Sequence, residues 1–511
     1  MTIHALTTDK IIAVIGAGTM GAGIAQVAAA GGHTVRLYDA ADGAAAAGIK
    51  KTTEGLDKLV SRGRIDVADR DAIVTRLIPA ERIEDLADSA MVIEAIVENL
   101  DVKRQLFQTL EQLCGDDTIL ATNTSSLSIT AIATGLKRPG QVVGMHFFNP
   151  APIMKLVEVI SGLETDATVA AQVFDTATRW RKHAVHARST PGFIVNRVAR
   201  PFYGEALRLL EENAADIATI DQVVKGAGGF RMGPFELIDL IGIDVNYAVS
   251  CSVFEAYYND PRYLPSLLQK ERVDGGRLGR KSGRGFYDYG DDASPLEARA
   301  HPAMATPNAI RVSPDCAILK PLIERFQRAG IEVTSDSKLD DVIQLPTGTM
   351  ALTDGRTATR RGFEDGIDNL LLIDLCLDYA ASDTIAISAS LGCDPQVTDE
   401  AAGLLKAAGL GSYLIADTPA LIVMRLVSML ANESAEVVHQ GICELEGVDI
   451  AMRGGVNYPR GPIEWADAIG LDTIYTVLNH LQQSYGSDRY RPSLKLAQQV
   501  YAGKPFLATE N

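Results

Sequence analysis

The sequence predicts an α/β domain with a doubly wound, mostly parallel sheet, then an all-helical domain, a reduced α/β segment and a second helical domain. Three observations predict this order. Residues 10–39 alternate apolar strand, glycine-rich turn, helix and strand, and further apolar strands follow along the chain. Residues 190–244 then recur, at an offset of 228 residues, at 418–472. The expected domain boundaries are 1–188, 189–292, 293–415 and 416–511.

Length and composition set the class of protein. A chain of 511 residues is too long for one core, and about three or four domains are expected. Its net charge of −17 argues against binding to nucleic acid, which requires clustered Lys and Arg. The first ten residues, MTIHALTTDK, lack a basic and an apolar region, so no signal peptide is expected. No apolar run approaches the ~20 residues of a membrane span.

The six cysteines are scattered singly, without CxxC spacing. This pattern favours reduced thiols over a disulfide framework or a zinc site. A cytoplasmic protein without a structural metal is therefore expected.

The first motif is KIIAVIGAGTMGAGIAQVAAAGGHTVRLYD, residues 10–39. Gly16, Gly18 and Gly21 form GxGxxG between a predicted strand and a predicted helix, which is where this motif is meaningful. Gly16 permits the tight turn, Gly18 allows the backbone to approach a pyrophosphate, and Gly21 allows close packing of helix and strand. The motif predicts dinucleotide binding by a Rossmann domain, with Thr19 and Met20 in the same turn.

Asp39 ends the second strand, about 20 residues beyond the glycines, where a carboxylate accepts a hydrogen bond from a ribose 2′-hydroxyl. No Arg follows it to bind a 2′-phosphate. The expected cofactor is therefore NAD rather than NADP.

Two further strands are predicted within residues 89–99 and 118–129. Glu98 and Ser125 lie at or just beyond their carboxyl ends, where ligands bind in parallel sheets. Alternatively, Glu98 caps the helix that begins near Leu100, and the serines are turn formers. Position alone does not decide between these interpretations.

The stretch GMHFFNP, residues 144–150, places a histidine at the end of an apolar strand. A lone His146 is more often a core residue with a satisfied hydrogen bond. The next strand, KLVEVI, however, carries Glu158 on the same face as Leu156 and Ile160, and a buried carboxylate needs a partner. A His–Glu pair beside a nicotinamide suits alcohol oxidation, because the histidine accepts the hydroxyl proton as hydride leaves carbon.

Several stretches together resemble the 3-hydroxyacyl-CoA dehydrogenase family. The resemblance runs through residues 1–290 almost without interruption. It is carried by GAGTMG, EAIVENLDVK, TNTSSLSI, GMHFFNPAPIMKLVEVI, TPGFIVNRV, GAGGFRMGPFELIDLIGID and GRKSGRGFYDY.

The resemblance implies roles for individual residues. His146 would be the catalytic base with Glu158 as its partner, and Ser125 and Asn196 would hydrogen-bond the C3 oxygen of the substrate. Within TPGFIVNRV, which predicts a helix beginning after Thr190-Pro191, Asn196 could also be a helix-surface residue. The NAD site implied by the resemblance further includes Glu98, Lys103, Asn149 and Lys281, although Lys281 could equally be a solvated loop cation.

The family binds coenzyme A near the helix that follows Asp39. Lys58, Arg62 and Arg64, in TTEGLDKLVSRGR, are candidates for contacts with the phosphates. Gly55 stands where the family often has Ser, so this segment departs from the family pattern.

The second half of the chain is a partial repeat of the first. TPGFIVNRV aligns with TPALIVMRL, and GPFELIDLIGID aligns with GPIEWADAIGLD. Met424 stands where Asn196 stands, and residues 293–415 contain no GxGxxG and no His–Glu pair. Within them, LLLIDLCLDYAASDTIAISASLGC suggests a shrunken α/β remnant. One active site per chain is expected.

The expected function is the NAD-dependent, reversible oxidation of a 3-hydroxyacyl-CoA to a 3-oxoacyl-CoA. The long form with a duplicated helical unit resembles bacterial phenylacetate-pathway enzymes that act on 3-hydroxyadipyl-CoA, and also 3-hydroxybutyryl-CoA dehydrogenases. Alternatives are a dehydrogenase of a free 3-hydroxy acid, and a binding protein that has lost turnover. In the family the helical domain pairs in a dimer, so a fused copy could cover that face or extend a homo-oligomer, a dimer or trimer.

Overall fold

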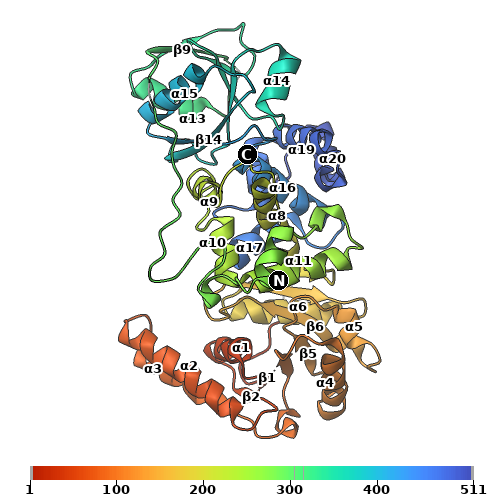
Figure 1. Ribbon diagram of the computed structural model, residues 1–511. Coiled ribbons are helices and arrows are strands. Elements are labelled where there is room, and N and C mark those ends of the chain that lie inside the picture. Colours follow the sequence, from red (N-terminus) through yellow and green to blue (C-terminus); the bar gives the residue numbers. More distant parts are fainter. Residues whose placement is uncertain (1–3, 304, 315, 508–511) are drawn as a thin grey trace. The chain divides into compact units, whose positions relative to one another are not determined.

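Two units, each containing its own sheet, make up the computed structural model (Figure 1). The structure describes residues 4–303, 305–314 and 316–507. Unit 1 comprises Met1–Arg197 and Gln440–Asn457, and unit 2 comprises Val198–His439 and Tyr458–Asn511. The four domain boundaries expected from the sequence stay predictions. Residues 1–3 of the stretch read as lacking a signal peptide lie outside the described residues.

The sheet of unit 1, here the first sheet, has the order β3-β2-β1-β4-β5-β6-β7-β8. All neighbouring strands are parallel except β6 and β7, which confirms the doubly wound, mostly parallel sheet. β1, β4 and β5 are buried throughout, because helices cover both faces, and such strands read as continuous apolar runs. The strands are β1 (Ile12–Ile15), β2 (Val35–Tyr38), β3 (Leu77–Pro79), β4 (Met91–Glu94), β5 (Ile119–Thr122), β6 (Val142–Phe147), β7 (Leu156–Ser161) and β8 (His183–Arg188).

The helices of unit 1 include one from the second half of the sequence. α1 packs on β1 and β2, α6 packs on β7 and β8, and α2 and α3 pack against each other. α17, which belongs to the repeated helical sequence, also packs on β7 and β8. The helices are α1 (Thr19–Ala30), α2 (Ala44–Ser61), α3 (Val67–Arg76), α4 (Leu100–Leu113), α5 (Ile129–Ala133), α6 (Ala167–Arg179), α7 (Val195–Val198, which ends in unit 2) and α17 (Leu445–Val456).

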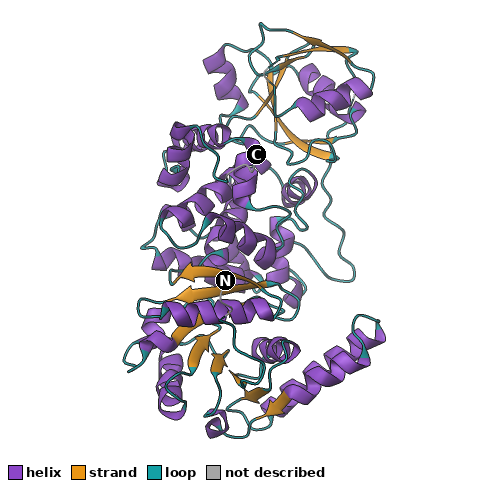
Figure 2. Ribbon diagram, turned by 180° about the vertical axis from the view of Figure 1, so that it is seen from behind, coloured by secondary structure: helices purple, strands orange, loops and turns teal. Residues whose placement is uncertain are grey.

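The expected α/β remnant is a complete seven-stranded sheet in unit 2, here the second sheet (Figure 2). Its order is β10-β9-β11-β12-β13-β14-β15, and from β12 to β15 the pairing is parallel, antiparallel, parallel, as from β5 to β8. β11 differs from β4, because it is antiparallel to both neighbours. The elements are β9 (Ala309–Val312), α13 (Lys320–Arg328), β10 (Glu332–Ser335), β11 (Ile343–Gln344), β12 (Thr349–Leu352), α14 (Ala358–Asp365), β13 (Leu370–Ile373), β14 (Thr384–Ala389), α15 (Pro395–Ala407) and β15 (Gly411–Leu414).

The helical repeat is visible element by element. We call α8 to α12 the first helical copy and α16 to α20 the second helical copy. α10 and α18 correspond at the full offset of 228 residues, and both begin with a Gly-Pro pair and a Glu that bonds back to the Gly N–H. The remaining elements are α8 (Arg200–Glu211), α9 (Ile217–Gly226), α10 (Pro234–Ile241), α11 (Ile243–Ala256), α12 (Leu267–Asp274), α16 (Val423–His439), α18 (Pro462–Ile469), α19 (Leu471–Tyr485) and α20 (Leu494–Ala502).

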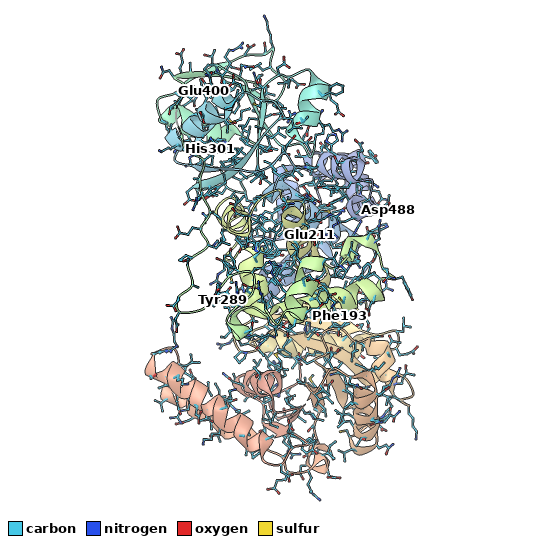
Figure 3. The ribbon with its side chains drawn as sticks, viewed as in Figure 1. Phe193, Glu211, Tyr289, His301, Glu400 and Asp488 are labelled. Atoms are coloured by element: carbon cyan, nitrogen blue, oxygen red, sulfur yellow. The ribbon has the colours of Figure 1, made fainter. Side chains whose placement is uncertain are left out.

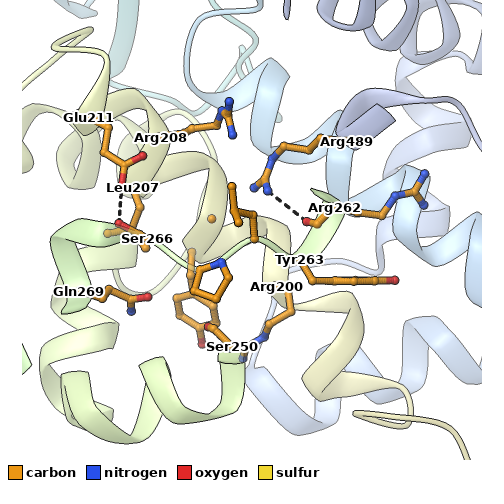
Figure 4. Close-up of a pocket in the computed structure, with 14 residues that line it drawn as sticks. Arg200, Leu207, Arg208, Glu211, Ser250, Arg262, Tyr263, Ser266, Gln269 and Arg489 are labelled. Carbon is orange, nitrogen blue, oxygen red and sulfur yellow. Dashed lines mark hydrogen bonds between the residues drawn. The ribbon is translucent and has the colours of Figure 1, made fainter. Parts of the chain in front are cut away.

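The two copies meet in unit 2 through equivalent residues. Glu205 of α8 accepts from Arg489, with Nε and Oε1 2.7 Å apart. Its repeat counterpart, Glu433 of α16, accepts from Arg262, the counterpart of Arg489, at 3.2 Å. Arg489 also donates to the backbone oxygen of Arg262 (Figure 4). Such reciprocal contacts are the signature of a two-fold interface, here formed within one chain.

Across the described residues, no single helix is long and apolar enough to cross a membrane. One bent pair, Pro234–Ile241 with Ile243–Ala256, passes by length and composition only. All six cysteines are free thiols.

Candidate active site

The three motif glycines of the β1–α1 turn have different surroundings. Gly16 has a φ of +99°, and a Cβ there would lie 2.5 Å from the carbonyl oxygen of Ala95. A Cβ at Gly21 would collide with the carbonyl oxygen of Gly16. Gly18, by contrast, faces open space, with no atom within 4 Å of the position of a Cβ. Gly16 and Gly21 therefore build the turn, while Gly18 leaves room for a ligand next to the first residues of α1, Thr19 and Met20.

A cavity of about 590 Å³ opens beside this turn. Asp39 lies in its wall, with Oδ2 2.6 Å from the N–H of Ala17 and Oδ1 2.9 Å from the N–H of Ala41. A carboxylate has about four acceptor positions, so hydroxyl groups of a ribose can still bind. Among the described residues that line the cavity none is Lys or Arg, and aliphatic side chains provide a surface for an adenine ring. These features fit NAD. The lining residues are Ile15, Gly16, Gly18, Tyr38, Asp39, Ala40, Ile83, Ala95, Ile96, Val97, Val102 and Leu106.

Glu98 organises the loop that follows β5. Its Oε1 accepts from Thr124 Oγ1 at 2.6 Å, from the N–H of Ser125 at 2.9 Å and from Ser126 Oγ at 3.1 Å. Burial opposes ionisation, but the hydrogen bond from Thr124 and the charge of Lys103 lower the pKa of Glu98. The capping interpretation of Glu98 is wrong, because the cap of α4 is Asn99, whose side chain accepts from the N–H of Val102.

Lys103 lies between two carboxylates, and one of them was missed in the sequence. Its Nζ is 3.3 Å from Glu98 Oε2 and 2.5 Å from Oε1 of the fully buried Glu94. Glu94 Oε2 also accepts from Thr122 Oγ1 at 2.6 Å. Glu94 stands in the apolar run MVIEAI, and a carboxylate there, at the end of a parallel strand, was the available signal.

His146 and Glu158 face each other across the antiparallel strands β6 and β7. His146 Nδ1 lies 2.7 Å from Glu158 Oε2. Oε1 of the same carboxylate accepts from the N–H groups of Ile194 at 3.1 Å and Val195 at 3.0 Å. Because a carboxylate only accepts, Nδ1 carries the proton and Nε2 presents a lone pair. Phe193, labelled in Figure 3, has its ring centroid 6.0 Å from that of His146.

The helix expected after Pro191 begins later, at Val195. Gly192 and Phe193 have positive φ values of 76° and 47°, so the chain makes a turn before the helix. That turn presents the N–H groups that bind Glu158. Asn196 then points its amide Nδ2 at the backbone oxygen of Ser125, 3.4 Å away. A series of contacts thus joins Ser125, Asn196 and Glu158 to His146.

The other candidate residues are not joined to this series by contacts in the described residues of unit 1. Asn149 is exposed beyond β6, and its peptide bond to Pro150 is cis. Lys281 belongs to unit 2, where its Nζ bonds Asp244 Oδ2 at 2.7 Å. The three basic candidates for coenzyme A binding are exposed at the end of α2 and just beyond it: Lys58, Arg62 and Arg64.

The second sheet does not repeat the His146–Glu158 pair. At the position of His146 it carries Asp374, whose N–H donates to Ala386, and Ala386 stands at the position of Glu158. Asp374 accepts from the N–H groups of residues 422–424 at 2.7–3.0 Å. Burial raises the pKa of Asp374 to about 6, against the effect of those hydrogen bonds. One carboxylate therefore replaces the pair and is used to hold the start of α16.

Three family models match successive parts of the chain. Residues 11–190 match the 3-hydroxyacyl-CoA dehydrogenase NAD binding domain, and residues 192–289 and 421–510 match the C-terminal domain of that family. Residues 350–419 match a 3-hydroxybutyryl-CoA dehydrogenase reduced Rossmann-fold domain.

Individual relatives cover the whole chain or its first half. An Escherichia coli 3-hydroxyadipyl-CoA dehydrogenase is 42% identical over 96% of this chain and 97% of the relative. The crystal structure of an Escherichia coli 3-hydroxybutyryl-CoA dehydrogenase is 41% identical, covering 97% of this chain and 99% of that one, with a TM-score of 0.88. The human mitochondrial hydroxyacyl-coenzyme A dehydrogenase is 41% identical over 55% of this chain and 91% of its own. The chain belongs to the 3-hydroxyacyl-CoA dehydrogenase family and is an NAD-dependent oxidoreductase that acts on a CH–OH group.

Proposed function

We propose that this dehydrogenase reversibly oxidises 3-hydroxyadipyl-CoA to 3-oxoadipyl-CoA, with one active site per chain. The observation that carries the chemistry is the buried His146–Glu158 pair, with Nδ1 and Oε2 2.7 Å apart. The adipyl group rests on similarity over nearly the full length to a relative named for that substrate. The similar crystal structure from Escherichia coli is instead named for 3-hydroxybutyryl-CoA, which makes the shorter acyl chain the second candidate.

In this proposal His146 Nε2 takes the proton of the substrate's 3-hydroxyl group. Glu158 stabilises the imidazolium that forms, and the two backbone N–H groups on its other oxygen keep it aligned. When bound, NAD accepts the hydride that leaves C3. Ser125 and Asn196 hydrogen-bond the C3 oxygen.

The proposed NAD site combines the motif turn with the edge of the first sheet. Asp39 binds the adenosine ribose, and Glu98 holds the loop beside the nicotinamide. Lys58, Arg62 and Arg64 are proposed for the coenzyme A phosphates. The proposed NAD-binding residues are Gly16, Gly18, Thr19, Met20, Gly21, Asp39, Glu98, Lys103, Ser125, Asn149 and Lys281.

The substrate is tested by the loss of NADH absorbance with 3-oxoadipyl-CoA, acetoacetyl-CoA and free acetoacetate, each beside a His146→Ala variant. We expect turnover of the thioesters only, with a higher kcat/KM for 3-oxoadipyl-CoA. A higher value for acetoacetyl-CoA would assign the shorter substrate. Turnover of free acetoacetate alone would show a free-acid dehydrogenase, and NADH binding without any turnover would show a binding protein.

Asp39→Asn is expected to raise the KM for NAD about tenfold with little change in kcat. The amide keeps its size but loses the charge-assisted hydrogen bond to the ribose, which contributes about 1.5 kcal/mol. Initial rates at a saturating acyl-CoA concentration measure the effect. Asp42→Asn, an exposed carboxylate in the same loop, is the matched control. An unchanged KM for NAD would remove Asp39 from the proposed site.

The assembly and location of the protein are also proposals. We expect a homo-oligomer, a dimer or trimer, in the cytoplasm. Light scattering after size-exclusion chromatography measures the first. A monomeric mass would indicate that the interface between the two helical copies replaces a dimer contact.

A further inference from the structure

Segment 440–457, from the second helical copy, lies in unit 1 with the first sheet. Two hydrogen bonds fix its beginning. The N–H of Arg188, at the end of the edge strand β8, donates to the carbonyl of Ile442 at 3.0 Å. The guanidinium of Arg197 donates to Gln440 Oε1 at 2.8 Å. The segment therefore begins beside β8, which pairs with β7, the strand that carries Glu158.

Gly455, on α17, faces three residues that flank the His146–Glu158 pair. A Cβ at this position would lie 2.7 Å from Leu156 Cδ2, 3.0 Å from Val195 Cγ2 and 3.5 Å from Phe148 Cε1. Each of these three residues contacts His146 or Glu158 or lies beside it on the same strand. Leu156 lies two residues from Glu158 on β7, Val195 donates its N–H to that carboxylate, and Phe148 has its ring centroid 4.5 Å from that of His146.

A second residue of the same segment, Cys443, is close enough to the carboxylate to be affected by its charge. The Cys443 side chain is buried, and burial together with the nearby charge of Glu158 raises the pKa of its thiol to about 12. At neutral pH this thiol is therefore uncharged. The segment thus borders the pair at its beginning and along its helix.

The two helical copies differ at the position of Gly455. In unit 2, α9 packs on β14, and a Cβ at Gly226 would collide with the side chain of Thr384. Its counterpart Gly454 approaches Leu156 in the same way, with 3.3 Å from a Cβ position to Leu156 Cβ. The next residue is Ala227, directly after α9, in the first copy but Gly455, within α17, in the second. The copy that packs on β7 and β8 therefore has a glycine where the other copy has an alanine.

We propose that segment 440–457 of the second helical copy is a positioning element for the His146–Glu158 pair. α17 holds Leu156, Val195 and Phe148 in place, and these fix the carboxylate and the imidazole relative to each other. The non-catalytic copy thereby sets the turnover rate of the catalytic half. This proposal rests on the proposed catalytic role of the pair.

Gly455→Ala tests the proposal, because the added methyl group presses on Leu156 Cδ2 and Val195 Cγ2, while alanine is the better helix former. We expect kcat for the oxidation of 3-hydroxybutyryl-CoA to fall about tenfold, since small misplacements of reacting groups are costly. KM for NAD and for the acyl-CoA should stay within about twofold.

Gly226→Ala is the matched control, since it adds the same methyl group to the equivalent helix against the second sheet. It should lower the thermal unfolding temperature but leave kcat at the value of the parent enzyme. Equal losses of kcat in both variants, or no loss in Gly455→Ala, would overturn the proposal.

If Gly455→Ala does not fold, Gln440→Ala decides by the same readouts, because it removes an anchor of the segment without adding volume. The parent enzyme is assayed in parallel. A parent that turns over no thioester would refute the proposed function, whereas an active parent with an equally active Gly455→Ala would refute only the positioning role.

Discussion

His146→Ala is expected to lower kcat about 10³-fold in both directions, while NADH still binds. The variant lacks the group that exchanges a proton with the C3 oxygen, and such proton transfer contributes about 10²–10⁴-fold to a rate. Stopped-flow single turnovers with 3-hydroxybutyryl-CoA measure the chemical step, and NADH fluorescence measures binding. His183→Ala, an exposed histidine of β8, is the control and should retain the parent rate.

The companion variant Glu158→Gln separates the base from its partner. It keeps an acceptor for Nδ1–H but removes the charge that stabilises the imidazolium, so its kcat should lie between those of the parent and His146→Ala. A His146→Ala enzyme with more than about a tenth of the parent kcat would exclude His146 as the base.

Glu205→Gln is expected to destabilise unit 2 by about 3–5 kcal/mol, because the buried Arg489 loses its counter-charge and the buried Arg425 keeps only Glu212. Glu205 is fully buried and accepts from Arg425 at 2.8 Å, Arg489 at 2.7 Å and the Tyr490 hydroxyl at 3.0 Å. Urea unfolding reports the effect through the fluorescence of Trp465 in a Trp180→Phe background. These are the two tryptophans of the chain, and only Trp465 belongs to unit 2.

The control for this variant is Glu211→Gln, on the exposed side of the same helix, where the carboxylate bonds Ser266 (Figure 4). Its free energy of unfolding should change by less than about 0.5 kcal/mol. A similarly small change in Glu205→Gln would show that the buried cluster does not hold the two helical copies together.

The same cluster predicts a pH dependence. Burial opposes ionisation, but the charges of Arg489 and Arg425 lower the pKa of Glu205 from 4.5 to about 2. A lowered pKa in the folded state stabilises the protein above pH 4.5, and the gain is lost as the pH falls from there towards 2. The difference in stability between the parent and Glu205→Gln should therefore narrow across that range.

Local patterns made the catalytic half predictable. The glycine turn lies directly between β1 and α1, and Asp39 directly follows β2. His146 and Glu158 lie on consecutive strands with a short connection. Strand alternation alone places them on one face. The family match confirms the expected cofactor, NAD.

Most of the features that were missed depend on contacts between separate segments. Glu94 had a local signal, a carboxylate in an apolar strand, but its partner Lys103 comes from the following helix. Most of the second sheet escaped notice because several of its strands have only two to four residues and no glycine motif precedes its first helix. The contact of α17 with β7 and β8 joins segments separated by residues 189–444, a distance in sequence over which periodicity carries no information.

That contact also determines when this part of the fold can be completed during synthesis on the ribosome. The strands that carry Glu158 are synthesised before residue 200, but the helix that covers them emerges only after residue 445. At translation rates of roughly 5–20 residues per second, the apolar side of β7 and β8 stays uncovered by α17 for about ten seconds to a minute. Nascent chains of intermediate length would therefore expose this side of β7 and β8 to chaperones until α17 has been synthesised.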